Sequence, residues 1–107
     1  MRATEFGVAA RREGNAAVLE LAGDVSGGAE PELLRAYRET GDTPVLVLDF
    51  GGVDYINSTG IALIVGLLAE ARKSRREVQA RGLTDHYREI FRITRLSDFM
   101  TILDDER

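Results

Sequence analysis

The chain has 107 residues, a net charge of −4 at neutral pH and no cysteine. This length suffices for one compact domain and is too short for two ordinary ones. The negative charge argues against general nucleic-acid binding, which needs a positive surface, and the absence of cysteine excludes disulfides and thiol chemistry. The N-terminus lacks the apolar core of a signal peptide, and the apolar run at residues 61–69 is far shorter than the roughly 20 residues that span a bilayer. We therefore expect a cytoplasmic protein that contacts neither nucleic acid nor membrane.

The first third of the chain predicts a β-hairpin followed by a helix. Residues 4–12 and 16–21 flank the turn sequence Glu-Gly-Asn and favour two strands. The glycine-rich segment 23–28 breaks this pattern and is typical of a loop. Pro31, which stands between two glutamates, then favours the first turn of a helix that ends near Gly41. The apolar stripe of this helix consists of Leu33, Leu34 and Tyr37.

The centre of the chain predicts a buried strand and a strongly apolar helix. Residues 45–50 form a mostly aliphatic run, which suits a strand covered on both faces. A glycine-bearing loop over residues 51–56 leads to a helix over residues 58–74. Five apolar residues line one face of this helix at helical spacing, namely Ile61, Ile64, Val65, Leu68 and Ala71.

Three small polar residues, Asn57, Ser58 and Thr59, stand at the start of the apolar helix. Each is a suitable N-cap, and the simplest interpretation is that Ser58 or Thr59 caps the helix. The free backbone N–H groups and the positive end of the helix dipole would also favour a negative group, such as a phosphate on Ser58. The spacing alone leaves both interpretations open.

The last third of the chain predicts a strand, a helix and a final strand. Residues 77–81 suit a short strand, Thr84 or Asp85 suits the cap of a helix, and residues 99–103 suit the last strand before an acidic tail at 104–106. The predicted inward residues of the helix are Tyr87, Ile90, Phe91 and Thr94. Strands that alternate with helices predict an α/β structure with helices on one or both faces of a mixed sheet.

No pattern of catalytic or metal-binding residues stands out. The single histidine, His86, is expected to be a surface residue, and the sequence around Ser58 lacks the Gly-x-Ser-x-Gly elbow of a hydrolase. Asp49 and Asp54 flank the central loop, where shaping a turn is favoured over binding Mg²⁺. The basic residues after the apolar helix, Arg72, Lys73, Arg75 and Arg76, are interpreted as partners of its negative end rather than as a nucleic-acid or lipid patch. We expect no catalytic residue, no metal and no enzyme activity.

The segment Val53–Gly66 resembles the phosphorylation-site segment of STAS domains, specifically of bacterial anti-sigma factor antagonists. Those proteins usually carry Asp-Ser-Ser/Thr-Gly ahead of a helix, and a partner kinase phosphorylates the serine after the aspartate. The resemblance implies Ser58 as the acceptor and Thr59 as the less favoured one. The order of elements also agrees over nearly the whole chain. It implies a single STAS-like domain over residues 1–107, with a mixed sheet of about four to five strands and helices packed mainly on one face.

Three features depart from the family pattern. Asn57 replaces the usual aspartate, which removes a negative charge beside the acceptor. Arg95 stands where the family often has glycine after the late helix, so this helix end is expected to be capped differently. The chain also stops soon after the last predicted strand, whereas many members continue into a terminal helix.

The resemblance implies an anti-sigma factor antagonist. Its unphosphorylated form would bind an anti-sigma factor that is also a serine/threonine kinase, and phosphorylation of Ser58 would weaken that complex. A PPM-type phosphatase would reset the switch, and ATP and Mg²⁺ would be bound by the kinase, so this chain needs no cofactor. The expected partner-binding residues are Asp24, Tyr55, Asn57, Ser58, Thr59, Gly60, Ile61 and Leu63.

Two alternatives stay open beside this interpretation. The chain could be a STAS subunit of a lipid-transport or other ABC-type transporter complex, in which Ser58 or Thr59 is a permanent contact. It could also be a scaffold subunit of a stress-sensing assembly in which many copies pack together. A homodimer is compatible with each of them.

Overall fold

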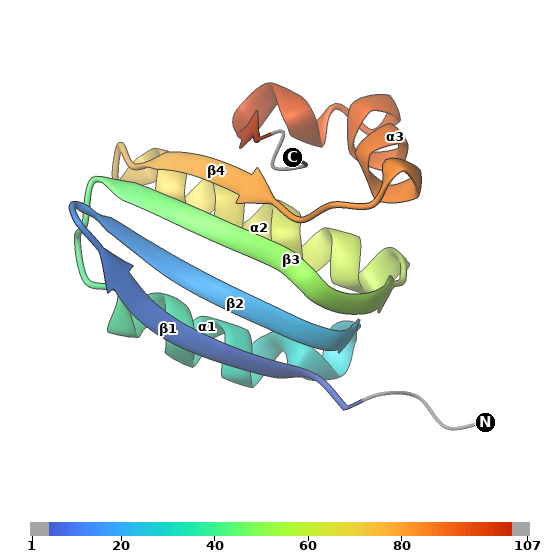
Figure 1. Ribbon diagram of the computed structural model, residues 1–107, viewed down its shortest axis with the longest axis horizontal. Coiled ribbons are helices and arrows are strands. Elements are labelled where there is room, and N and C mark those ends of the chain that lie inside the picture. The colour runs from blue at the N-terminus through green and yellow to red at the C-terminus, as the bar shows by residue number, and fades with distance from the viewer. Residues whose placement is uncertain (1–4, 104–107) are drawn as a thin grey trace.

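The computed structural model describes residues 5–103, which form a five-stranded sheet and three α-helices (Figure 1). The strands are β1 (Gly7–Glu13), β2 (Ala16–Val25), β3 (Val45–Ile56), β4 (Glu77–Arg81) and β5 (Thr101–Ile102). The α-helices are α1 (Glu30–Glu39), α2 (Ser58–Lys73) and α3 (Asp85–Ile93), and the 3-10 helices are η1 (Gly27–Ala29) and η2 (Leu96–Phe99). None of the described helices is long and apolar enough to cross a membrane.

The strands lie in the order β1-β2-β3-β4-β5 and form a mixed sheet. The hairpin makes β1 antiparallel to β2, whereas β2, β3, β4 and β5 run parallel to their neighbours. Parallel neighbours need crossover connections, which the helical segments supply. Figure 1 shows α1 and α2 behind the sheet and α3 beyond β4. The predicted α/β fold, a mixed sheet with helices mainly on one face, is therefore confirmed.

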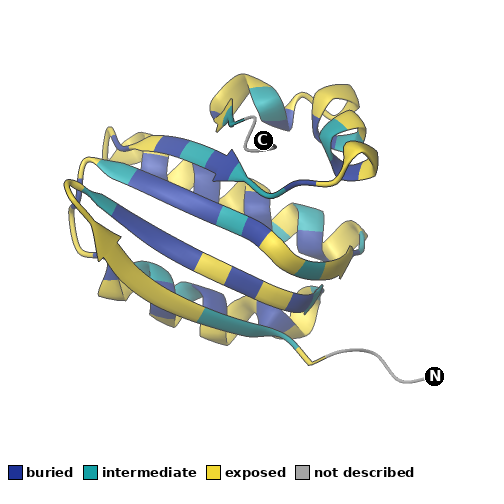
Figure 2. Ribbon diagram, viewed as in Figure 1, coloured by how far each residue is buried: buried dark blue, intermediate teal, exposed yellow. Residues whose placement is uncertain are grey.

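The core lies between the sheet and the helices, and its centre is formed by β2 and β3. Both central strands are largely buried along their first halves (Figure 2). Phe91 of α3 is fully buried and meets the ring of Phe50 edge to face, with a centroid distance of 5.7 Å. Such an aromatic pair stabilises the fold by about 0.5–1.5 kcal/mol beyond the contribution of the apolar area that the two rings bury. The largest fully buried side chains are Phe91, Leu19, Leu46, Leu48, Ile64, Val18 and Val25.

The face of the sheet that lacks helices is covered by its own charged side chains. Val18 and Val47 lie on this face and are nevertheless buried. Ion pairs join the charged groups around them, namely Arg11–Glu20, Arg11–Glu13 and Arg81–Asp49, with N–O distances of 2.8, 2.5 and 3.2 Å. The hydrogen bond from Arg11 lowers the pKa of Glu13 below its ordinary value. The aliphatic stems of long charged side chains thus replace a second layer of helices on this face.

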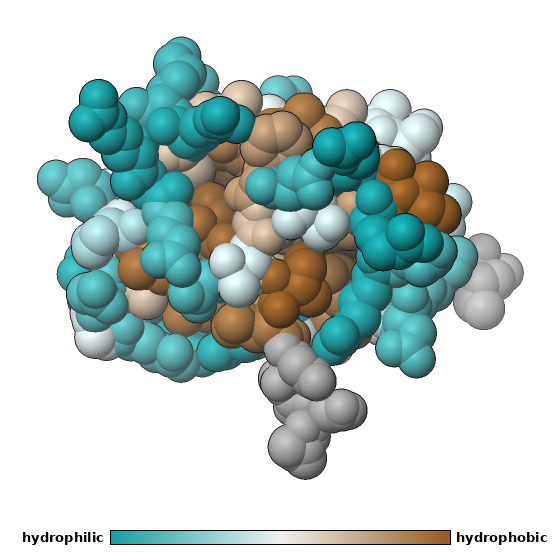
Figure 3. Space-filling model, turned by 90° about the horizontal axis from the view of Figure 1, so that it is seen from above, coloured by the Kyte–Doolittle hydropathy of each residue, from teal (hydrophilic) through white to brown (hydrophobic). Residues whose placement is uncertain are grey.

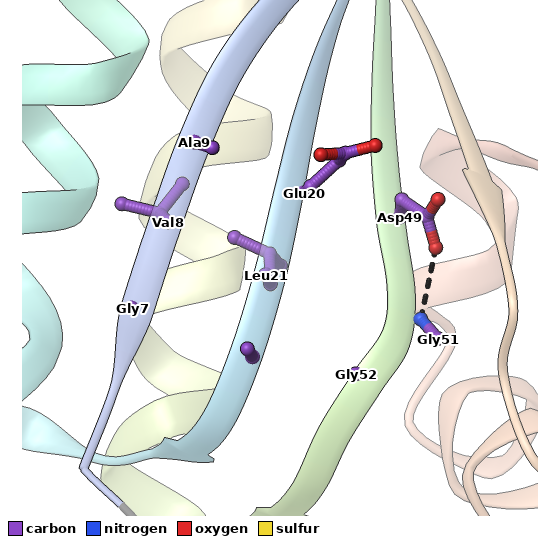
Figure 4. A pocket seen from close by; sticks show the side chains of 9 residues that line it. Gly7, Val8, Ala9, Glu20, Leu21, Asp49, Gly51 and Gly52 are labelled. Carbon is purple, nitrogen blue, oxygen red and sulfur yellow. Dashed lines mark hydrogen bonds between the residues drawn. The ribbon is translucent and has the colours of Figure 1, made fainter.

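The expected loop over residues 51–56 is instead the second half of β3. After a register shift, Gly52 pairs with Ala22 and Ile56 pairs with Val25, so both strands continue beyond the glycines. Asp49 Oδ1 accepts a hydrogen bond of 2.9 Å from Gly51 N at this irregularity, beside a shallow hollow in the uncovered face of the sheet (Figure 4). The glycine pair indicated a turn, but Gly51 N bonds to the Asp49 side chain and Gly52 pairs with Ala22 of β2, so the strand continues. As a result, β2 and β3 end side by side.

Three further sequence predictions differ from the structure. The last strand is only two residues long, because Phe99 belongs to η2 and is half exposed. Val65 and Thr94, which were predicted to face inward, are exposed, while Leu67 occupies the buried face of α2. Arg95 adopts the left-handed conformation with φ of 69°, so an arginine takes the backbone geometry that usually favours glycine. The predicted acidic tail lies outside the described residues.

Replacing Tyr87 with phenylalanine is expected to lower the free energy of unfolding by about 1–3 kcal/mol. The buried Tyr87 hydroxyl accepts a hydrogen bond of 2.8 Å from Ile56 N, which fastens α3 to the end of β3. Phenylalanine would leave this buried N–H without its partner. Denaturant unfolding measures the loss, and Tyr55→Phe is the matched control, because Tyr55 is 55% exposed and its hydroxyl has no hydrogen bond within the described chain. Equal stability of the two variants would contradict this role.

Candidate functional site

The residues predicted to form the site meet where β2 and β3 end and α2 begins. Asn57 has an extended backbone, and its Oδ1 accepts a hydrogen bond of 2.8 Å from Gly60 N. Asn57 is therefore the N-cap of α2. The interpretation of Ser58 or Thr59 as the cap is wrong, because the amide one position earlier already occupies the capping geometry.

Thr59 connects the start of α2 to the loop that follows β2. Its Oγ1 donates a hydrogen bond of 2.8 Å to Asn57 Oδ1 and accepts one of 2.9 Å from Gly27 N. Gly27 is the first residue of η1, 32 positions earlier in the chain. The Thr59 hydroxyl thus has a structural task, since it holds η1 against the end of the helix.

Ser58 is the first residue of α2 and has no such task. It is exposed, and no described residue makes a hydrogen bond with its hydroxyl. The first turn of α2 contains no acidic residue, so the positive helix end is not neutralised from within the helix. Of the two adjacent hydroxyls, Ser58 is the one that can be modified without breaking a contact.

Gly60 allows α2 to begin directly against β2. A Cβ atom at this position would lie 2.0 Å from Val25 O and 3.2 Å from the Ile56 side chain. Only a residue without a side chain fits there, because the obstructing atoms belong largely to backbone. The close contact fixes the position of Ser58 relative to the sheet.

The other predicted partner-binding residues surround this point. Asp24, half-buried at the end of β2, pairs in register with Tyr55, which is 55% exposed. Ile61 and Leu63 are half-buried and pack against the core. The structure thus brings all eight predicted residues to one end of the molecule. Their role in binding stays a prediction.

The sequence did not indicate two other residues of this surface. Gly27 contacts Thr59 across a long sequence separation, which no local pattern could reveal. Ala62 is exposed on α2, whereas Ile61 and Leu63, which looked accessible from the sequence, face partly inward. The wide apolar face of α2 hid which of its residues remain at the surface.

Within residues 5–103 no group of histidine, aspartate and glutamate side chains is arranged to hold a metal ion. His86 is exposed and meets the ring of Tyr87 edge to face, with a centroid distance of 4.9 Å. Asp49 is engaged with Arg81 and with Gly51 N on the face of the sheet. The site is therefore a small polar surface beside exposed apolar side chains, a composition suited to contact with another protein.

Substitution of Asn57 by alanine is expected to lower the free energy of unfolding by about 1 kcal/mol, because the cap of α2 and the acceptor of the Thr59 hydroxyl are lost together. Substitution by aspartate keeps an oxygen that can accept both hydrogen bonds and adds negative charge at the positive helix end. It should therefore retain stability or raise it by about 0.3–1 kcal/mol. Thermal and denaturant unfolding of both variants test this. An alanine variant as stable as the aspartate variant would refute the capping role.

Comparison with known proteins supports the family resemblance. Residues 8–104 match the family model described as "Mlab, STAS domain". The anti-sigma-B factor antagonist of Listeria monocytogenes is 31% identical over 88 residues, which cover 80% of this chain and 77% of that protein. The protein of the same name from Staphylococcus aureus is 32% identical over 71 residues, which cover 66% of this chain and 65% of that protein.

Solved structures show the same fold at low sequence identity. The unphosphorylated anti-sigma factor antagonist SpoIIAA superimposes with a TM-score of 0.71 at 14% identity and covers 95% of this chain and 90% of its own. An anti-sigma factor antagonist from Mycobacterium paratuberculosis gives a TM-score of 0.72 at 19% identity, with coverage of 92% and 85%. The family model, the relatives and the shared fold agree, and the chain belongs to the STAS domain family.

Proposed function

We propose that this protein is an anti-sigma factor antagonist that acts by binding an anti-sigma factor and so releases a sigma factor. The observation that carries the proposal is the exposed Ser58 hydroxyl at the start of α2, which makes no hydrogen bond within residues 5–103. Support comes from relatives that are named anti-sigma-B factor antagonists. The fold is also shared with SpoIIAA, which is known in an unphosphorylated and a phosphorylated form.

The switch in this proposal is phosphorylation of Ser58 by the anti-sigma factor acting as a serine/threonine kinase. A phosphate carries a charge of about −1.5 to −2 at neutral pH, and at this position it would be stabilised by the N-terminal end of α2. The modified chain would therefore remain folded. The same charge on the docking surface would repel acidic groups of the partner and would have to be desolvated in the complex.

The exposed geometry also indicates how the partner would dock. Ser58, Tyr55 and the exposed residues of the first turns of α2 form one accessible surface, and Thr59 holds η1 beside it. The kinase would bring its own ATP and Mg²⁺, and a PPM-type phosphatase would remove the phosphate. The Asn57 amide would take the place of the usual aspartate, with less repulsion toward a phosphorylated neighbour.

The decisive experiment mixes the purified chain with the anti-sigma factor kinases encoded in the same genome and measures binding by calorimetry. Each mixture is then supplied with ATP and Mg²⁺, and the phosphorylated residue is identified by mass spectrometry. The proposal predicts one partner that binds the unmodified chain, phosphorylates Ser58 and then dissociates. If no kinase binds and the chain instead co-purifies with a transporter ATPase, the transporter-subunit alternative replaces the proposal.

A further inference from the structure

A second exposed surface lies at the other end of α2, where the helix meets η2 and the start of β4. Two adjoining hollows occupy it, with volumes of about 280 and 640 Å³. They share Leu68, Arg72 and Phe99, so they form one continuous groove with an apolar part and a basic part. Figure 3 views the molecule from the side of α3 and β4 and shows apolar groups gathered between hydrophilic side chains. We call these two hollows the C-terminal groove.

The apolar part of the C-terminal groove displays large side chains that no described element covers. Val65 of α2 is 47% exposed, and Phe99 of η2 is 50% exposed. The wall between them is also apolar, being formed by Leu68, Ala69 and Leu96. Exposed aliphatic and aromatic groups that converge on a hollow are typical of a position where a partner inserts an apolar side chain.

The basic part contains three arginines, none of which forms an ion pair with a described residue. The Arg72 guanidinium lies 5.4 Å from the centroid of the Phe99 ring, which orients it over the groove. Arg75 lies at the helix end with a left-handed φ of 58°. Arg76 is only 7% exposed and donates hydrogen bonds to the carbonyl and hydroxyl oxygens of Thr43, yet no carboxylate of the described part of the chain pairs with it.

The carboxylates near this groove are already engaged. Asp98 accepts a hydrogen bond of 2.7 Å from Arg95, and Glu77 accepts one of 3.1 Å from the Gln79 side chain. In a chain with a net charge of −4, four arginines of the sheet, α1 and α3 form ion pairs with carboxylates, whereas these three have no carboxylate partner among residues 5–103. The negative end of α2 stabilises these cations only in part, and they remain available to external carboxylates.

We propose that the C-terminal groove binds an acidic segment of a partner protein, in which a bulky apolar side chain is flanked by carboxylates. The apolar side chain would enter the hollow beside Val65 and Phe99. The carboxylates would form charge-assisted hydrogen bonds with Arg72 and Arg75, whose planar donors suit bidentate binding. Arg76 would add positive potential from its buried position. The charge complementarity of the groove selects an acidic partner over a basic one.

The basic part of this groove is remote from Ser58. The closer of its two exposed arginines, Arg72, follows Ser58 by fourteen positions, which corresponds to about 21 Å along the helix. A phosphate on Ser58 would be screened over this distance at physiological salt, where the Debye length is about 8 Å. Binding at the C-terminal groove should therefore not depend on the state of Ser58, and it does not rest on the proposed function.

The test selects a random heptapeptide display library on the full chain. Peptides that also bind the double variant Arg72→Gln/Arg75→Gln are removed, because they do not depend on the two arginines. An enriched peptide is synthesised, and its affinity is measured by fluorescence anisotropy at low and physiological salt. The proposal predicts peptides with an aromatic or aliphatic residue between acidic ones. Affinity should fall at least tenfold in the double variant and with Phe99→Ala, and circular dichroism checks that both variants are folded. Two control variants, Lys73→Gln at an exposed neighbouring residue and Ser58→Asp, should each change the peptide affinity less than twofold.

Each other outcome overturns the proposal. No enrichment, or enrichment of neutral or basic peptides, would show that the arginines are only solvated partners of the helix end. An affinity that falls with Ser58→Asp would place the peptide at the other end of α2. Concentration-dependent self-association lost in the double variant, without peptide binding, would assign the groove to a second copy of this chain.

Discussion

Gly60→Ala is expected to lower the free energy of unfolding more than any other glycine-to-alanine substitution in this chain. The new Cβ would lie 2.0 Å from Val25 O and 2.7 Å from its carbonyl carbon, both backbone atoms of β2. Because the strand cannot yield as a flexible side chain can, α2 must move away from the sheet. We expect a loss of about 3 kcal/mol or more in the free energy of unfolding, at or above the upper end for overpacked positions. Denaturant unfolding measures it.

Gly66→Ala is the matched control within the same helix. A Cβ at Gly66 meets nothing within 4 Å, and the residue is exposed on α2. There alanine should raise the free energy of unfolding by about 0.8–1 kcal/mol, because glycine is a poor residue for a helix interior. Opposite signs for one substitution in one helix would isolate the close contact between α2 and β2. If both variants lose or gain stability equally, helix propensity rather than this contact decides the effect.

The type and order of the main elements could be predicted from the sequence because their signals are local. The aliphatic run from Val45, the proline and glutamates that open α1, and the apolar helix after Asn57 each follow from spacing and residue type. The extension of β3 could not be predicted in this way. Gly51 and Gly52 have the composition of a turn, but Gly52 pairs with Ala22 of β2 and β3 continues through them.

The location of the site was predicted from the sequence, but the separate roles of its residues were not. Sequence spacing and the family resemblance located the helix start, but three neighbouring residues were all suitable caps. The choice depends on where the backbone bends, which in turn depends on the contact of Gly60 with Val25. The structure thus distinguishes three roles that the sequence could not: Asn57 caps α2, Thr59 holds η1, and the Ser58 hydroxyl makes no hydrogen bond with another described residue.

The sequence also could not show which apolar residues of α2 face the core. A helix with apolar residues on most of its circumference gives no clear stripe, so Val65 and Leu67 could not be distinguished by period alone. Their positions follow from the face that α2 turns to the core, where Leu67 is buried, and from η2, which leaves Val65 47% exposed. Tertiary packing, rather than local propensity, decides which apolar residues of this helix remain available to a partner.

Ser58→Asp is expected to lower the affinity for the anti-sigma factor on the order of 100-fold while leaving the fold intact. Aspartate places a negative charge where the proposed phosphate would stand, and in the complex this charge would face the partner without solvent. The positive end of α2 should tolerate it, so the free energy of unfolding should stay within about 0.5 kcal/mol of the original chain. Calorimetric titration with the partner measures the affinity, and denaturant unfolding measures the stability.

Two control variants separate charge at Ser58 from other causes. Ser74→Asp adds the same charge at the exposed far end of α2 and should leave partner affinity within about twofold, because the charge is screened over that distance. Thr59→Val removes the contact with Gly27 without adding charge, so any loss of affinity would then come from movement of η1. If Ser58→Asp and Ser74→Asp weaken binding equally, the partner senses total charge and not this residue. If only Thr59→Val weakens it, the position of η1 is what the partner recognises, and Ser58 is not the switch.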